Sequence, residues 1–169
     1  MNNLMNPKYP EGRNLFQDKN ILITAAAGSG IGFSTAKRFL EEGANIFISD
    51  VHQGRLDEAI DDLRNLNLGK VNGCLCNVTN DEEIDSMFTE AIACYSNLNG
   101  VINNAGLGGE SVLEDMTNDA WDLVMDVTLN GAMKIMRAAI PVLKDTQGVI
   151  VNNASVLGWR AQAGQSHYA

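Results

Sequence analysis

The sequence predicts an α/β fold in which a parallel sheet carries helices on both faces, the doubly wound arrangement. Short apolar runs rich in β-branched residues alternate along the chain with segments of helical periodicity. A turn with three glycines joins the first apolar run to the first helical segment. Strands that alternate with helices pair in parallel through right-handed crossovers, so we expect one sheet with the strand order 3-2-1-4-5.

The first predicted unit is a strand, a helix and a second strand. The apolar run over residues 21–23 is too short for a helix and suits a strand that is buried on both faces. Apolar residues recur at helical spacing from Ile31, and Gly43 stands where a helix end favours a residue with positive φ. Residues 45–50 resume as a strand.

The later elements repeat this alternation. A capping box over Thr79–Glu82 is expected to start the third helix, because the Thr79 hydroxyl and the Glu82 carboxylate can each satisfy a free backbone N–H. The periodicity predicts helices over about 56–66, 84–95 and 117–143, and strands over 71–76, 100–104 and 148–154.

Length and composition indicate one ordinary globular domain over residues 18–169, preceded by a polar arm over residues 1–17 that is extended or mobile. The net charge of −9 argues against binding to nucleic acids or anionic membranes, which need a basic surface. No apolar run reaches the length of a membrane span, and no signal peptide is evident, so we expect a cytoplasmic protein. Three cysteines and two histidines lack the spacing of a metal site.

The glycine turn is the first feature that indicates a ligand. Turn residues without side chains let backbone N–H groups approach a pyrophosphate, and the dipole of the following helix favours its negative charge. Asp50, 18 residues after Gly32, is placed to accept hydrogen bonds from both hydroxyls of a ribose. We therefore expect a dinucleotide here, with its phosphates against Ala26, Gly28, Ser29, Gly30, Ile31 and Gly32.

Two other interpretations stay open on this pattern alone. The turn could join strand and helix without binding a ligand. Glycines at this spacing followed by an acidic strand end also describe methyltransferases that use S-adenosylmethionine. Only residues further along the chain can separate these classes.

Motifs after the fourth and fifth strands narrow the choice. Asn103–Gly106 reads Asn-Asn-Ala-Gly, Ser155 follows the fifth strand, and Tyr168 lies 13 residues beyond Ser155. From about Lys19 to its last residue, the chain resembles the single-domain short-chain dehydrogenases/reductases, which have a Rossmann fold. This resemblance disfavours the methyltransferase interpretation.

The resemblance implies an oxidoreductase that interconverts a ketone and a secondary alcohol with NAD or NADP. Ser155 and Tyr168 correspond to the catalytic pair, in which the phenol protonates the nascent alkoxide and the serine polarises the carbonyl. Thr128 stands where the family has a further catalytic residue, an asparagine. The family's contacts to the adenosine side of the cofactor correspond to Asn77, Val78, Asn104, Ala105 and Gly106.

The segment around Ser155 and Tyr168 most resembles 3-oxoacyl reductases and enzymes that act on coenzyme A thioesters in sterol-ring breakdown. The implied substrate is a 3-oxoacyl or hydroxyacyl thioester of coenzyme A or acyl carrier protein, and the implied assembly is a homo-oligomer. NAD is expected rather than NADP, because Asp50 would repel a 2′-phosphate. Arg55 is the one nearby residue that could soften this preference.

Three departures from the family pattern lie within the chain. Ala25 and Ala26 replace the usual Thr-Gly, so the turn must tolerate a Cβ at Ala26. Asn77 replaces an aspartate and offers the same acceptor plus a donor. The Thr128 hydroxyl could hold the water that the asparagine normally holds, whereas Asn130 lies about 200° further round the helix and cannot substitute.

The fourth departure concerns the family's Tyr-x-x-x-Lys motif. Its lysine, which holds the nicotinamide ribose and favours ionisation of the tyrosine, would be the third residue beyond Ala169, and the family's last strands would also follow. We therefore expect an incomplete sheet with an exposed fifth strand, and no catalysis by the 169-residue chain itself. A non-catalytic nucleotide-binding fragment is the remaining alternative.

Overall fold

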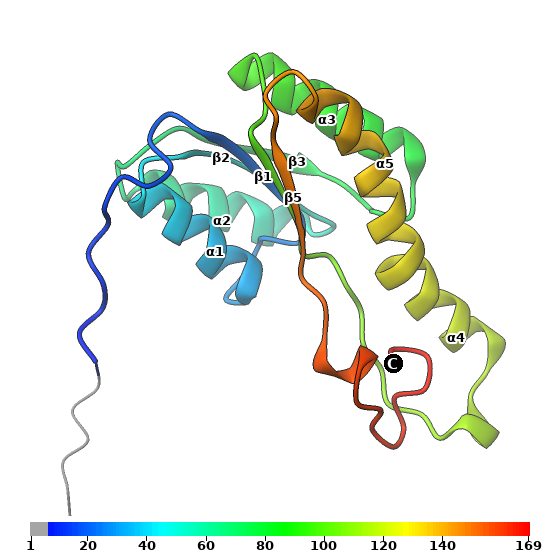
Figure 1. Ribbon diagram of the computed structural model, residues 1–169. Coiled ribbons are helices and arrows are strands. Elements are labelled where there is room, and N and C mark those ends of the chain that lie inside the picture. Colours follow the sequence, from blue (N-terminus) through cyan, green and yellow to red (C-terminus); the bar gives the residue numbers. More distant parts are fainter. Residues whose placement is uncertain (1–6) are drawn as a thin grey trace, which may run out of the picture.

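The computed structural model describes residues 7–169 as one parallel sheet with helices on both faces (Figure 1). The strand order is β3-β2-β1-β4-β5, and every neighbouring pair is parallel, which confirms the predicted Rossmann-type fold and its order. The strands are β1 (Asn20–Ile23), β2 (Asn45–Asp50), β3 (Val71–Leu75), β4 (Gly100–Asn103) and β5 (Val149–Asn152).

Two helices, α1 and α2, cover one face of the sheet, and α3 and α5 cover the other (Figure 1). The α-helices are α1 (Ile31–Glu41), α2 (Gln53–Arg64), α3 (Asp81–Tyr95), α4 (Asn118–Met125) and α5 (Gly131–Leu143). Shorter helical turns are η1 (Leu113–Asp115), η2 (Asp126–Asn130) and η3 (Val156–Gly158).

The central strands are buried on both faces. In β1, Ile21 and Ile23 pack against α1 and α2, whereas Leu22 joins Phe47 of β2 in the core beneath α3 and α5. Each such side chain contributes about 1.5–3 kcal/mol by leaving water. Because a one-residue slip would exchange the two faces, this burial fixes the register and brings the carboxyl ends of the strands to one edge.

The start of α3 differs from the prediction by one residue. Asn80, not Thr79, is the N-cap, and its side chain accepts hydrogen bonds from the N–H groups of Glu82 and Glu83 at 3.0 and 3.2 Å. Glu83 completes the reciprocal pair by accepting from Asn80 Nδ2 at 3.1 Å. The predicted capping box over Thr79–Glu82 is therefore wrong, because the Thr79 hydroxyl binds Asn77 instead.

The long helix predicted over residues 117–143 is interrupted by a π-helical turn, η2, between α4 and α5. In this turn the N–H of Gly131 bonds to the carbonyl of Asp126, five residues back. A Cβ at Gly131 would lie 2.8 Å from Cγ2 of Val78, so glycine lets the helix pass close to the end of β3. The extra residue turns Thr128 toward the loop after β4.

The described part of the N-terminal arm, residues 7–17, lies along α1 (Figure 1). Arg38 donates to two carbonyl groups of the arm, and buried Glu42 accepts from the N–H groups of Arg13 and Leu15 at 2.7 and 3.2 Å. These contacts hold the described part of the arm to the domain. Residues 1–6 lie outside the described residues.

The outer strand β5 is an open edge in the part of the chain that the structure describes. Ile150 packs toward α5, and the alternating residues Val149 and Val151 face the other side with 60% and 51% of their surface exposed. This confirms the expected exposure of the fifth strand. Within residues 7–169, no helix has the length and apolar character needed to cross a membrane.

Candidate functional site

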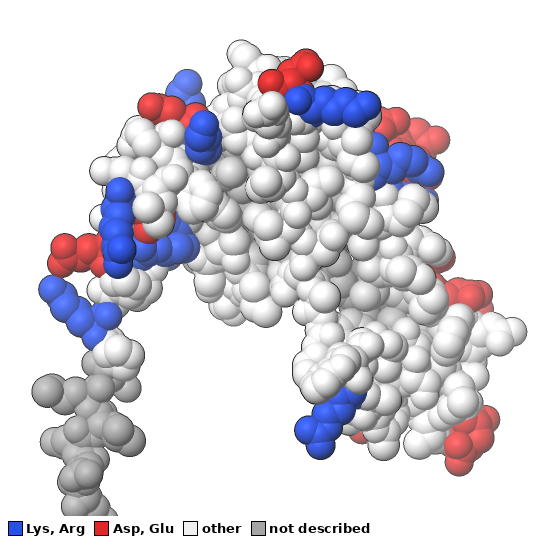
Figure 2. Space-filling view, in the orientation of Figure 1, with Lys and Arg blue, Asp and Glu red and all other residues white. Residues whose placement is uncertain are grey.

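A cleft of about 790 Å³ opens at the carboxyl ends of β1, β4 and β5. Every described residue that lines the cleft is uncharged. In the view of Figure 2, the charged side chains lie mainly near the outline of the molecule. The cleft brings together nine of the predicted site residues: Gly30, Ile31, Gly32, Asn104, Ala105, Gly106, Thr128, Ser155 and Tyr168.

A second hollow of about 310 Å³ continues from this cleft, because Ala25, Ala105 and Gly106 line both. The predicted residues Asp50, Asn77 and Val78 line the second hollow. Of the other predicted residues, Gly28 and Ser29 are exposed on the turn, and Ala26 is buried beneath it. The two hollows together form one groove across the carboxyl edge of the sheet.

The glycine turn accommodates the departure at Ala26 without strain at that residue. Ala26 is fully buried in the core, and its N–H donates to the carbonyl of Ser49 at 3.0 Å. The residues of the turn with left-handed backbone conformation are instead Ala25, with φ of 50°, and Gly28, with φ of 84°. A Cβ at Gly32 would lie 2.4 Å from the carbonyl oxygen of Ala25, so glycine is required there for close packing.

The start of α1 has the features of a phosphate site. Gly30 is the N-cap and provides no side-chain cap, and the first turn contains no acidic residue. A Cβ at Gly30 would meet no atom of the described residues within 4 Å, so the space beside the backbone is open. The unpaired N–H groups and the helix dipole therefore face a free volume, which fits a pyrophosphate.

Asp50 lies at the end of β2 with only 8% of its surface exposed. Its Oδ2 accepts from the N–H of Ala27 at 3.3 Å, and its Oδ1 accepts from the N–H of His52 at 3.1 Å. Each oxygen keeps a lone pair for a further donor, such as a ribose hydroxyl. Nη2 of Arg55 lies 3.8 Å from Oδ1, so the predicted cation is present beside the carboxylate.

Asn77 does not offer the acceptor that the sequence suggested. Its Oδ1 already accepts two hydrogen bonds from Thr79, one from the backbone N–H and one from the hydroxyl, both at 3.0 Å. A carbonyl oxygen has two lone pairs, so its capacity is used within the protein. Nearby, burial raises the pKa of the Cys76 thiol to about 12, which makes Cys76 a neutral, apolar part of the wall.

Thr24 and Asn153 are structural supports that the sequence reasoning missed. The Thr24 hydroxyl accepts from the N–H groups of Asn104 and Ala105, both at 2.9 Å. Asn104 Nδ2 donates to the carbonyl of Ala25 at 3.1 Å, and its Oδ1 accepts from Asn153 Nδ2 at 2.8 Å. These bonds join the ends of β1, β4 and β5 around the cleft. The only signal in the sequence is that each residue directly follows a strand.

Ser155 is the N-cap of η3, and its Oγ accepts from the N–H of Leu157 at 3.2 Å. This bond uses a lone pair and leaves the hydroxyl proton available for donation to a ligand in the cleft. Tyr168 lines the same cleft and is partly exposed. Ser155 and Tyr168 thus line the same cleft.

The segment that carries Tyr168 docks on the loop after β4. Ser111 pairs with Gln165 in a parallel bridge, and the Ser111 N–H donates to the carbonyl of Gly164 at 2.9 Å. His167 is buried, and its Nε2 would lie 2.9 Å from a Cβ at Gly109. The position of Tyr168 thus depends on a loop that is distant in sequence.

That loop is in turn held by Thr128 of η2. The Thr128 hydroxyl accepts from the Leu107 N–H and donates to the Leu107 carbonyl, each at 3.0 Å. Asn130 instead donates to Oδ1 of Asp126 at 2.7 Å, so it does not take the place of Thr128. Thr128 therefore lines the cleft with its hydroxyl bound to the backbone of Leu107.

Comparison with known proteins places these residues in a family. The family model described as short chain dehydrogenase matches residues 19–169. The chain is 47% identical over its whole length to (5R,7aS)-5-hydroxy-7a-methyl-1-oxo-2,3,5,6,7,7a-hexahydro-1H-indene-carboxyl-CoA reductase of Mycobacterium tuberculosis, of which it covers 65%. It is 34% identical to the 3-oxoacyl-[acyl-carrier-protein] reductase FabG of Thermotoga maritima over 90% of this chain and 62% of that protein.

Solved structures agree with this assignment. A short chain dehydrogenase from Mycobacterium smegmatis has 49% sequence identity and a TM-score of 0.93, with 96% of this chain and 69% of that chain covered. A short chain dehydrogenase/reductase from Burkholderia phymatum, solved in complex with NAD, has 28% identity and a TM-score of 0.86, with 90% and 54% covered.

The chain spans less than two thirds of the length of these two curated relatives. The family match nevertheless covers the whole sheet, the glycine turn and the Ser155–Tyr168 region, which rules out the methyltransferase interpretation. The chain belongs to the short chain dehydrogenase family.

Proposed function

We propose that this chain is the cofactor-binding and partly catalytic portion of an NAD-dependent ketoreductase or alcohol dehydrogenase. The observation that carries the proposal is the single cleft in which Gly30, Ser155 and Tyr168 meet. A helix start that suits a phosphate, beside a pair of hydroxyl groups, fits the transfer of a hydride to a carbonyl. A bound nicotinamide would supply or accept the hydride.

Residues of this chain suit two parts of such a cofactor, the pyrophosphate and a ribose. The open backbone at Gly30 suits the pyrophosphate, and the free lone pairs of Asp50 suit the ribose hydroxyls. NAD is proposed over NADP, because the buried carboxylate of Asp50 would lie against a 2′-phosphate. Arg55 reduces this repulsion only in part, since more than half of its side chain is exposed to solvent.

In ketone reduction, Ser155 would donate its free hydroxyl proton to the carbonyl oxygen, and Tyr168 would transfer a proton to the nascent alkoxide. In the reverse direction, Tyr168 would accept the proton of the alcohol. The proposed substrate is a 3-oxoacyl or hydroxyacyl thioester, because the two curated relatives are named as reductases of a CoA thioester and of an acyl carrier protein thioester. A homo-oligomer in the cytoplasm stays part of this proposal.

Two measurements test the proposal. The 169-residue chain should bind NADH, observed as enhanced fluorescence of the reduced nicotinamide, and a Gly30→Asp variant should abolish binding because a carboxylate would occupy the phosphate space. Asn118→Asp, which adds the same charge at the exposed start of α4 away from both hollows, is the control.

Catalysis is tested on the protein translated from the coding sequence together with whatever follows Ala169. That protein should oxidise NADH in the presence of acetoacetyl-CoA. Binding of NADH without turnover would favour the non-catalytic alternative, whereas failure to bind any dinucleotide would reject both.

A further inference from the structure

Two glycines that line the cleft, Gly108 and Gly158, belong neither to the phosphate turn nor to the pair of hydroxyl groups. Gly108 lies in the loop after β4, and Gly158 ends the helical turn η3 after β5. Both line the same cleft as Ser155 and Tyr168, so they border the space of the proposed reaction from two separate segments.

The fold does not need glycine at either position. Neither Gly108 nor Gly158 has the positive φ that favours glycine. A Cβ added to either residue would meet no atom of residues 7–169 within 4 Å, its chain neighbours aside. Among the 16 glycines of the chain, only Gly30 and Gly54 share this combination. Three of these four glycines line one cleft, so the open space is a property of the cleft.

Two other glycines of the same region have structural reasons. A Cβ at Gly109 would lie 2.9 Å from Nε2 of buried His167, so packing requires glycine there. Gly164 has a φ of 74°, so its backbone conformation favours glycine. Neither reason applies to Gly108, although it directly precedes Gly109.

Gly158 lies close to the proposed catalytic serine. Its N–H donates to the carbonyl of Ser155 at 3.1 Å, and the Ser155 Oγ accepts from the N–H of Leu157 at 3.2 Å. The turn η3 is thus folded tightly onto Ser155. Because Gly158 lines the cleft, a side chain at this position would take space from the cleft near the serine.

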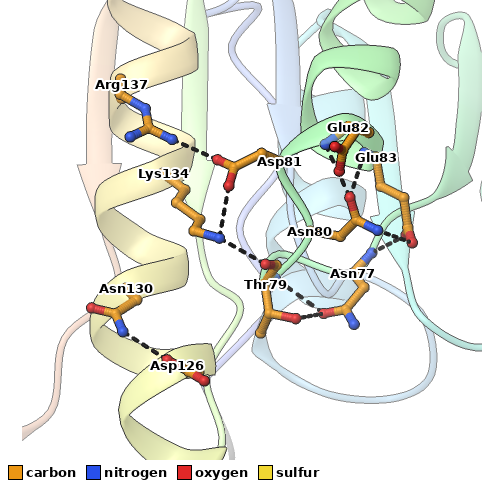
Figure 3. A network of polar contacts seen from close by, with 10 residues as sticks. All are labelled: Asn77, Thr79, Asn80, Asp81, Glu82, Glu83, Asp126, Asn130, Lys134 and Arg137. Atoms are coloured by element: carbon orange, nitrogen blue, oxygen red, sulfur yellow. Dashed lines mark hydrogen bonds and ion pairs between the residues drawn. The ribbon is translucent and has the colours of Figure 1, made fainter.

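The loop that carries Gly108 is held in place by η2. The Thr128 hydroxyl binds the N–H and the carbonyl of Leu107, the residue before Gly108, at 3.0 Å each. Within η2, the amide of Asn130 donates to Oδ1 of Asp126 at 2.7 Å (Figure 3). The loop is therefore fixed on a hydrogen-bonded turn, and it cannot readily move to make room for a side chain at Gly108.

We propose that Gly108 and Gly158 determine substrate specificity, because they keep both sides of the reacting carbonyl open for ketones with branched or cyclic carbon on both sides. This inference rests on the proposed function. If Ser155 and Tyr168 take the carbonyl oxygen, the two substituents of the ketone extend along walls where these glycines leave space. A ketone with a methyl group on one side would need only one such open wall.

The test compares two 3-oxoacyl thioesters of coenzyme A. Acetoacetyl-CoA has a methyl group on one side of its ketone, whereas 2-oxocyclohexanecarboxyl-CoA has ring carbons on both sides. The protein translated through Ala169 and beyond should reduce both with NADH. Gly108→Val and Gly158→Val should each lower kcat/KM for the ring ketone at least about tenfold, and for acetoacetyl-CoA less than about threefold.

Alanine at the same two positions should shift the ratio of the two kcat/KM values in the same direction by a smaller factor, and it carries the test if a valine variant does not fold. The dissociation constant of NADH, measured by nicotinamide fluorescence, should stay unchanged in all four variants. Ala93→Val adds methyl groups at an exposed position on α3, outside the residues that line the cleft, and should alter neither quantity.

An equal fall of kcat/KM for both thioesters, or no fall for the ring ketone, would overturn the inference. So would an unaltered protein that reduces acetoacetyl-CoA but not the ring ketone. Loss of NADH affinity in the variants would also overturn it, because the space beside the glycines would then belong to the cofactor. The proposed function fails separately, if the unaltered protein neither binds NADH nor reduces acetoacetyl-CoA.

Discussion

The hydroxyl of Thr128 holds both backbone polar groups of Leu107, accepting from its N–H and donating to its carbonyl at 3.0 Å each. Two elements that are far apart in sequence, the turn η2 and the loop after β4, are joined by this one side chain. Because the segment that carries Tyr168 docks on the same loop, we expect Thr128 to act on the proposed reaction centre as a positioning residue.

Thr128→Val should destabilise the chain by about 1–2 kcal/mol, since two hydrogen bonds are lost and two backbone groups are left without partners. Urea denaturation measures this loss as a lower midpoint at a constant slope. Thr89→Val is the matched control, because among the described residues its hydroxyl bonds only to the carbonyl of Asp85 within α3.

Thr128→Asn should be close to neutral. The amide of asparagine has one donor and one acceptor and can reproduce both bonds to Leu107. Equal destabilisation by Val and Asn at this position would contradict the positioning role, because it would show that the shape of threonine and not its hydrogen bonds is what matters.

Asp50→Ala should lower the affinity for NADH and raise the relative affinity for NADPH. The variant removes the acceptor for the ribose hydroxyls and the repulsion of a 2′-phosphate, and it leaves Arg55 without its partner carboxylate. Dissociation constants for the two reduced cofactors, measured by nicotinamide fluorescence, report the ratio.

Asp57→Ala is a suitable control for that experiment, since Asp57 is an exposed carboxylate on α2 that bonds only to Gln53 among the described residues. An unchanged ratio of NADH to NADPH affinity in Asp50→Ala would remove Asp50 from the cofactor site.

Tyr168→Phe should lower kcat by at least about a hundredfold with little change in cofactor affinity, because general acid–base groups contribute 10²–10⁴-fold and act chiefly in the transition state. The assay uses the protein translated through Ala169 and beyond, with NADH and acetoacetyl-CoA. Tyr9→Phe, an exposed tyrosine on the arm, is the control. Full activity of Tyr168→Phe would exclude the phenol as the proton donor.

The strand order and the glycine turn were predictable because both follow from local patterns. Residues such as Leu22 and Phe47 mark strands that are buried on both faces, and the connection rules leave few orders for such strands. Gly32 could be placed at the turn from the spacing of the glycines between strand and helix. The structure adds that a side chain there would collide with the carbonyl of Ala25.

Contacts between distant segments were not predictable from the same patterns. The π-helical turn depends on the approach of Gly131 to Val78, and no spacing within the helix signals it. The N-cap of α3 is Asn80 and not Thr79, because the Thr79 hydroxyl donates to Asn77. Either residue type can cap a helix, so the sequence alone did not decide between them. The same hydrogen bond occupies the side-chain oxygen of Asn77.

The last prediction concerns the arm and pH. The pKa of Glu42 is lowered from its ordinary value of 4.5, first by the N–H of Arg13, then by the N–H of Leu15 and by Arg38. A carboxyl group with a lowered pKa stabilises the folded state fully above its ordinary pKa, and this contribution is lost as the pH falls through the folded value. The arm should therefore stay docked at pH 5 and above and detach only below pH 4.5.

The chemical shifts of the Arg13 and Leu15 amide protons measure the docking directly, because both donate to Glu42. Their common midpoint should lie below 4.5, and a midpoint at or above that value would contradict the role of Glu42. At neutral pH, Glu42→Gln should speed tryptic cleavage after Arg13, since the pairing with Arg38 is lost. Glu58→Gln, on the exposed face of α2, should leave the cleavage rate unchanged.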